Sequence, residues 1–145
     1  MSTIDDAATR ISTAYAAAVY ERDVAAFMRL YDPSARVFDT WATWSYEDAA
    51  ARRGSIAGWL GSLGDERVRV TFSDLRSSGS ADLLAVSAVV TYAAWSAAGV
   101  ELRSMQNRLS WVLACRDGEL RIVHEHTSVP IGDHDLRGIL QRSLA

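Results

Sequence analysis

The spacing of the apolar residues changes at Gly64, and this change constrains the fold more than any other feature of the chain. Before Gly64, apolar residues recur every three or four positions, which is typical of amphipathic helices. After it they alternate with polar residues, as in Val68, Val70 and Phe72, which is typical of strands. Helices followed by a run of strands predict an α+β domain, in which the helices pack on one face of a curved antiparallel sheet.

Three helical segments are expected before the change in period. The first runs from Thr3 to about Arg22, a short second one follows as far as Pro33, and the third begins at Ser45. A strand over residues 35–41 is expected between the second and third helices, because its side chains alternate between two distinct faces.

Long strands joined by tight turns are expected over most of the remaining chain. Residues 77–82 and 97–99 are rich in turn formers, and the pair Asp117-Gly118 is a strong hairpin signal because both residues tolerate positive φ. These turns separate strands that we expect over residues 83–95, residues 101–115 and from residue 120 onward. A short helix is expected in the tail, over residues 136–144.

The length and composition favour one globular domain over residues 1–145, with a C-terminal tail from about residue 131. Cys115 is the only cysteine, so no disulfide can form within the chain, and we expect a cytoplasmic location. No stretch approaches the roughly 18 apolar residues of a membrane-spanning helix. The net charge of -3 without blocks of like charge argues against a nucleic-acid or membrane partner.

All fifteen basic residues are arginine, and the absence of lysine limits the chemistry that the chain can perform. Lysine-dependent aldolase and pyridoxal-phosphate mechanisms need an amine that forms a Schiff base, so both are excluded. The chain also lacks the glycine-rich motifs of dinucleotide and nucleoside-triphosphate sites. We therefore expect a protein that works without a cofactor.

The last strand changes character along one of its faces. Leu120 and Ile122 are apolar, and because alternate side chains of a strand share a face, His124, His126 and Ser128 continue their line. An apolar row that ends in two imidazoles indicates a hydrophobic cavity with polar groups at its bottom or mouth. The alternative is that both histidines are structural polar groups with partners inside the fold.

The segment from Ile11 to Asp39, ISTAYAAAVYERDVAAFMRLYDPSARVFD, resembles the opening of ketosteroid isomerase without a gap. With the order of the expected elements, it makes the chain similar to the SnoaL-like and ketosteroid isomerase-like domains of the nuclear-transport-factor-2-like superfamily. The C-terminal HEHTSVP, residues 124–130, resembles a large bacterial subgroup of SnoaL-like domains. The resemblance implies a cone-shaped domain whose strongly curved sheet and N-terminal helices enclose a pocket.

The resemblance also implies roles for individual residues. Tyr15 corresponds to the tyrosine of the isomerase oxyanion hole, and Asp39 corresponds to its general base. The isomerase has a protonated aspartate where this chain has Ser110, and a hydroxyl is a weaker donor than a carboxylic acid. Arg108, two residues earlier on the same face, is expected to supply positive charge there instead.

A candidate site follows from the residues and the resemblance together. His124 and His126 share a face and, with Asp39, have the residue types of a metal triad, but the sequence fixes no further ligand and we expect no metal. The expected catalytic residues are Asp39 as the base and Tyr15, Arg108, His124 and His126 as groups that bind or protonate an oxyanion, and the expected substrate contacts are Trp41, Trp44, Trp59, Ser110 and Ser128.

Three functions are compatible with this set of residues. The first is a small cofactor-free enzyme that isomerises, cyclises or dehydrates a hydrophobic small molecule with a carbonyl group, polyketide-like or steroid-like. The second is a non-catalytic small-molecule-binding or dimerisation module of the same fold, because a fold does not determine a function. The third is an epoxide hydrolase-like enzyme, which needs an Asp-Arg-Asp set for which only Asp39 and Arg108 are candidates.

A homodimer through the outer face of the sheet is also expected. Leu109, Trp111 and Leu113 alternate with Arg108 and Ser110, which are predicted to face the pocket. The three large apolar side chains would then lie on the outer face, where a second copy of the chain would cover them.

Overall fold

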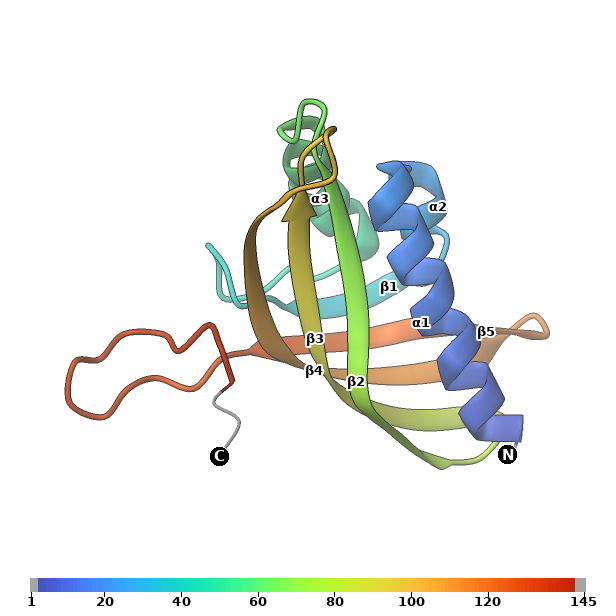
Figure 1. Cartoon of the computed structure of the whole chain (residues 1–145). Helices are drawn as coiled ribbons and strands as arrows, with labels where there is room; N and C mark the ends of the chain where they lie inside the picture. The colour runs from blue at the N-terminus through green and yellow to red at the C-terminus, as the bar shows by residue number, and fades with distance from the viewer. Residues whose placement is uncertain (1–2, 143–145) are drawn as a thin grey trace.

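The computed structural model describes residues 3–142, which form three helices and five strands (Figure 1). The five strands make one sheet in the order β1-β5-β4-β3-β2, in which β1 is parallel to β5 and all other neighbours are antiparallel. The helices are α1 (Thr3–Glu21), α2 (Val24–Met28) and α3 (Ala49–Gly61), and the strands are β1 (Tyr31–Phe38), β2 (Arg67–Gly79), β3 (Leu83–Trp95), β4 (Glu101–Arg116) and β5 (Glu119–Ser128).

The predicted α+β architecture is confirmed, with one correction to the sheet. The expected antiparallel sheet is mixed, because β1 is not joined to β5 by a hairpin and no tight turn sets its direction. The sheet bends strongly around the helices, with α1 packed against β2 and α3 packed against β1 (Figure 1). In the part of the chain that is described, no helix is long and apolar enough to cross a membrane.

Two aspartates fix where the second and third helices begin. The Asp23 carboxylate accepts a hydrogen bond from Ala26 N at 3.0 Å, and the Asp48 carboxylate accepts one from Ala51 N at 2.8 Å. Each cap satisfies a backbone N–H that the first turn of a helix leaves without an intrahelical partner. The predicted cap at Asp23 is therefore confirmed.

β1 begins before Pro33 and ends before Asp39, so it lies earlier in the chain than predicted. Pro33 is tolerated there because β1 is an edge strand, where a missing N–H breaks no ladder between two neighbours. After Asp39 the chain loops away, and Tyr46 returns to exchange two backbone hydrogen bonds of 2.8 and 2.9 Å with Val37. This bridge keeps the chain extended past Ser45, which is why the third helix starts later than expected.

The pairing of β4 with β5 contains a β-bulge. Ile122 pairs with Leu113 and His124 pairs with Val112, so Val123 is an extra residue on β5. A bulge of this kind places two residues opposite one and reverses the faces that all later side chains of the strand take.

The bulge decides which residues of β5 face the helices. Glu125 and Thr127 are buried on the inner face, whereas His126 is exposed and His124 and Ser128 are only partly buried. The expectation that the apolar row continues into the two histidines is therefore wrong, because strict alternation holds only where no residue is inserted.

The faces of β4 are also the reverse of those predicted. Leu109, Trp111 and Leu113 are at most 1% exposed and belong to the core under the helices, whereas Arg108 and Ser110 are exposed on the outer face. The residues expected to form a dimer interface are thus unable to do so. The homodimer remains a prediction, but these three residues no longer support it.

The tail contains no helix over residues 136–142, and the remaining residues of the predicted helix, 143–145, lie outside the described part of the chain. A loop closed by a bridge between Ile131 and Gly138 projects from the body of the molecule (Figure 1). Beyond it, Leu140 O accepts a hydrogen bond of 2.7 Å from Gln106 N. β5 has ended by this point, so the tail satisfies β4 backbone groups in its place.

We predict that Leu113→Ala lowers the free energy of unfolding by about 2–5 kcal/mol, because it leaves a cavity in a fully buried site. The control is Ser110→Ala, on the same strand but on the outer face, which should change stability by less than about 0.5 kcal/mol. Urea unfolding followed by tryptophan fluorescence measures both variants. Equal losses in the two variants would contradict the assignment of the β4 faces.

Candidate active site

A cavity of about 650 Å³ lies between the helices and the inner face of the sheet. Much of its wall is aromatic or aliphatic, with Ile56 and Trp59 contributed by α3. Two groups among its polar side chains differ in charge. The carboxylate cluster consists of Asp39, Arg52, Glu125 and Thr127, and the tyrosine pair consists of Tyr15 and Tyr92.

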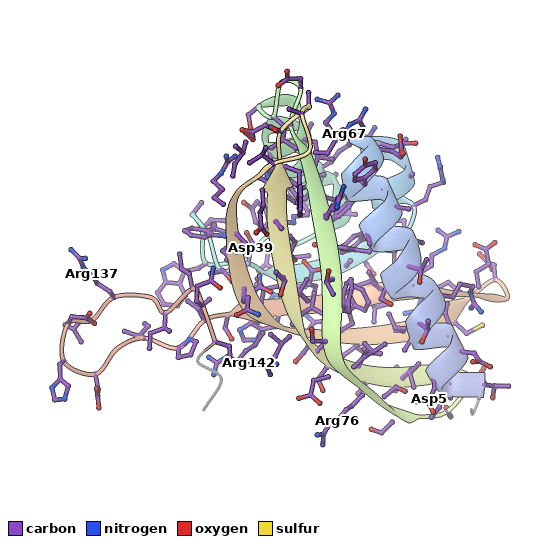
Figure 2. All side chains as sticks on the ribbon, in the orientation of Figure 1. Asp5, Asp39, Arg67, Arg76, Arg137 and Arg142 are labelled. Atoms are coloured by element: carbon purple, nitrogen blue, oxygen red, sulfur yellow. The ribbon has the colours of Figure 1, made fainter. Side chains whose placement is uncertain are left out.

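Asp39 lies just after β1, inside the body of the molecule, whereas Arg137 lies far away on the projecting loop (Figure 2). The Asp39 side chain is 13% exposed. Its Oδ1 atom accepts a hydrogen bond from Thr127 Oγ1 at 3.1 Å and another from Arg52 Nη2 at 3.4 Å. Partners of this kind are what a mostly buried carboxylate requires, and they hold Asp39 in one orientation.

Thr127 is itself held in place by the loop that follows Asp39. Its Oγ1 atom accepts a hydrogen bond of 2.9 Å from Thr40 N, and the Thr40 hydroxyl donates to the same oxygen at 3.0 Å. Because the Thr127 hydroxyl proton is given to Asp39, the end of β5 and the loop after β1 are joined at the cavity wall.

Arg52, on α3, lies between two carboxylates. Its Nη2 atom is 3.4 Å from Asp39 Oδ1 and 3.9 Å from Glu125 Oε2, and its Nη1 atom donates to Ser55 Oγ at 2.9 Å. Burial alone would lower the pKa of Arg52, but the charges of Glu125 and Asp39 outweigh burial and raise that pKa. Arg52 is therefore a permanent cation inside the protein.

Glu125 anchors this arginine to the core. Its side chain is 1% exposed, and its Oε1 atom accepts hydrogen bonds from Tyr31 Oη at 2.5 Å and Trp111 Nε1 at 2.9 Å. Burial raises the pKa of Glu125, while Arg52 and the two donors act in the opposite direction. Glu125, whose Oε1 atom is occupied by core donors, thus positions Arg52.

The tyrosine pair forms the second polar group of the cavity. The hydroxyl of Tyr15, on α1, lies 3.0 Å from the hydroxyl of Tyr92, on β3. Burial raises the pKa of both phenols, so both remain neutral at physiological pH and can act as hydrogen-bond donors. The cavity thus contains both charged groups and neutral donors.

Only some of the predicted site residues meet at this cavity. Trp44 is 96% exposed and lies away from it. Because of the bulge and the reversed faces of β4, several of the predicted site residues lie on the outer face of the sheet. There the rings of His124 and His126 contact the ring of Phe38. The predicted residues that line the cavity are Tyr15, Asp39, Trp41 and Trp59, and those on the outer face are Arg108, Ser110, His124, His126 and Ser128.

Four residues of the site were missed by reasoning from sequence. Arg52 lies in a helical pattern where an arginine usually faces solvent, and Tyr92 lies in an apolar run typical of core. Glu125 and Thr127 were assigned to the other face of β5, and only recognition of the bulge at Val123 could have placed them correctly. Among residues 3–142, no three His, Cys, Asp or Glu side chains are grouped so that they could hold a metal ion.

We predict that Arg52→Met lowers the free energy of unfolding by about 3–5 kcal/mol at neutral pH, because Glu125 then lacks its buried cation. The loss should shrink as the pH falls. The pKa of Glu125 is raised in the folded state, so its protonated form contributes stability at low pH that is lost as the pH rises through the folded pKa. Without Arg52 this dependence should become steeper.

The matched control for this substitution is Arg53→Met, which removes an exposed arginine from the next position of the same helix. Urea unfolding at several pH values between 5 and 8.5 compares the two variants. A loss in Arg52→Met that does not depend on pH, or an equal loss in both variants, would contradict the role given to Glu125 and Arg52.

Solved structures of other proteins share this fold. A nuclear-transport-factor-2-like protein of unknown function from Pseudomonas putida KT2440 is 16% identical, with a TM-score of 0.83 and coverage of 99% of both chains. A candidate scytalone dehydratase from Novosphingobium aromaticivorans DSM 12444 is 13% identical, with a TM-score of 0.74 and coverage of 97% of this chain and 94% of that one. A candidate dehydratase of the same fold family from Streptomyces avermitilis is 13% identical, with a TM-score of 0.72 and coverage of 87% and 95%.

Comparison with curated proteins gives no match. The model of the SnoaL-like domain, by contrast, matches residues 9–132, which include all the residues of the cavity described above except the tail residue Leu140. This match confirms the family that the sequence resembles. The chain belongs to the SnoaL-like domain family and has the fold of nuclear-transport-factor-2-like proteins.

Proposed function

We propose that this protein is a cofactor-free enzyme that performs acid–base chemistry on a hydrophobic carbonyl compound, with Asp39 as the general base. One observation carries the proposal: Asp39 and the tyrosine pair line the same cavity, and much of the remaining wall is apolar. Apolar walls bind a hydrophobic ligand, a carboxylate accepts a proton, and a neutral phenol donates to an oxygen that becomes negative.

In the proposed reaction, Asp39 removes a proton from the carbon next to the carbonyl group of the substrate. The electrons of the broken C–H bond move into the carbonyl, and the resulting enolate oxygen accepts a hydrogen bond from the tyrosine pair. The hydrogen bonds from Thr127 and Arg52 both use Oδ1 of Asp39, so they fix the carboxylate without occupying Oδ2.

The fate of the enolate decides the overall reaction. Return of the proton from Asp39 to a different carbon gives isomerisation. Attack of the enolate carbon on a second carbonyl, with the proton passed to the new alkoxide, gives cyclisation. Loss of the β-hydroxyl group as water, with the proton from Asp39, gives dehydration. Two of the similar structures come from candidate dehydratases, so we place dehydration of a β-hydroxy carbonyl compound first.

Epoxide hydrolysis is a second candidate function, because Arg52 lies between two carboxylates, those of Asp39 and Glu125. This is the acid–arginine–acid order of an epoxide hydrolase-like site, with Arg52 in place of the Arg108 that the sequence indicated. Glu125 is already bonded to Tyr31 and Trp111, however, which leaves Asp39 as the acid that could activate water. We therefore rank this function below enolate chemistry.

We predict that Asp39→Asn slows proton removal by about 10²–10⁴-fold, because an amide keeps the shape of the side chain but cannot accept the proton. The assay is deuterium incorporation from D2O at the carbon next to the carbonyl, followed by NMR on a panel of aryl ketones, β-hydroxy ketones and 1,3-diketones. Exchange reports proton abstraction even where no net product forms.

Asp133→Asn is the matched control, since Asp133 lies almost fully exposed on the projecting loop and should exchange substrate like the wild type. Full activity in Asp39→Asn would rule out its role as the base. Tight binding of panel compounds by the wild type without exchange would instead favour the non-catalytic binding module. Opening of a hydrophobic epoxide, with no exchange on any ketone, would favour the second candidate function.

A further inference from the structure

The two tyrosines of the pair stand in different surroundings, although their hydroxyl groups are neighbours. Tyr15 is 3% exposed, and its ring contacts the rings of Phe27, Phe72 and Trp111 at centroid distances of 4.9, 5.6 and 5.7 Å. Tyr15 is therefore a core residue on three sides, and its hydroxyl is the polar end of a packed aromatic cluster.

Tyr92 belongs to the wall of the cavity itself. It lies on the inner face of β3, it is only partly buried, and its ring meets the ring of Trp59 edge-on at 6.1 Å. Trp59 reaches the cavity from α3 and adjoins Tyr92 there. A ligand held between α3 and the sheet would thus lie against Tyr92.

Each phenol has one proton to donate, and the direction of donation within the pair matters. Among the described residues, Tyr92 is the hydrogen-bond partner of the Tyr15 hydroxyl. If Tyr92 donated to Tyr15, the proton of Tyr15, which is 3% exposed, would have no acceptor among the described residues, which is unfavourable for a buried donor. If Tyr15 donates to Tyr92, its proton is satisfied and the proton of Tyr92 is left for a ligand.

Like Tyr15, Asn107 lowers the pKa of Tyr92. It lies on β4, lines the cavity and is 7% exposed. Burial raises the pKa of Tyr92, but the hydrogen bonds from Tyr15 and from the Asn107 side chain both lower it. A donor to a phenol oxygen polarises its O–H bond and makes it a stronger donor to another group.

We infer that Tyr92 donates the hydrogen bond that holds the negatively charged oxygen of the ligand, a planar enolate or phenolate, and that Tyr15 is a positioning residue that acts through Tyr92. The inference rests on the proposed function for the identity of the charged oxygen. It also reverses the role that the resemblance implies, in which Tyr15 itself contacts the oxyanion.

The test uses a series of substituted 2-naphthols of graded acidity, whose neutral and ionised forms have distinct absorbance spectra. Binding of the naphtholate form is measured in the wild type, in Tyr92→Phe, in Tyr15→Phe and in the double variant. We expect Tyr92→Phe to weaken binding by about 10- to 100-fold, the range for a hydrogen bond to a charged group, and Tyr15→Phe to weaken it by about three- to tenfold.

The double variant separates an indirect role from a direct one. Because Tyr15 acts through Tyr92, removing Tyr15 should have no further effect once Tyr92 is phenylalanine, and the double variant should match Tyr92→Phe. The neutral compound 2-methoxynaphthalene, which has no ionisable oxygen, should bind all four proteins equally. Equal binding of this compound shows that the cavity is intact in every variant.

Three results would overturn the inference: a loss in Tyr15→Phe as large as that in Tyr92→Phe, additive losses in the double variant, or no binding of any naphtholate by the wild type. The test is separate from that of the proposed function. Naphtholate binding that depends on Tyr92, together with ketone exchange that does not depend on Asp39, would reject Asp39 as the base and leave the inference standing.

Discussion

The buried guanidinium of Arg52 is the interaction on which the rest of the site depends. It faces Glu125 on the core side and Asp39 on the cavity side, so one cation links the packing of the protein to the group that meets the ligand. A buried charge is tolerated only when it is paired and hydrogen-bonded. Glu125 meets that condition through its hydrogen bonds with Tyr31 and Trp111. Core residues therefore fix the orientation of Arg52 and, through it, the orientation of Asp39.

The bulge at Val123 makes this arrangement possible, because it places Glu125 on the inner face of β5. Without the extra residue, the inner positions after Ile122 would be taken by the two histidines, and Glu125 would face outward. The histidines would then replace an acid as the partner of Arg52, and the guanidinium would lack a carboxylate on its core side. A single inserted residue therefore sets the sign of the charge that the core presents to the cavity.

Most of the fold was predictable from sequence, because helix caps, hairpin signals and periodicity are local. Asp23 and the turn Asp117-Gly118, whose residues have φ of 53° and 82°, behave as their residue types predict. The presence of Asp39 and Tyr15 at one cavity also followed from the resemblance. The remaining site residues did not, since the inner face of β5 depends on a bulge and Arg52 depends on a partner 73 positions away in the chain, and neither leaves a periodic signal.

The two polar groups of the cavity fit a reaction in which negative charge moves from Asp39 to the ligand. One cation, Arg52, serves two acids, so a proton taken up by Asp39 leaves Arg52 matched with Glu125 alone. The negative charge then lies on the ligand, at the end where the cavity offers neutral phenols. A second cation there would hold an anionic product tightly, whereas a neutral donor stabilises the developing charge with a bond that strengthens as the charge grows.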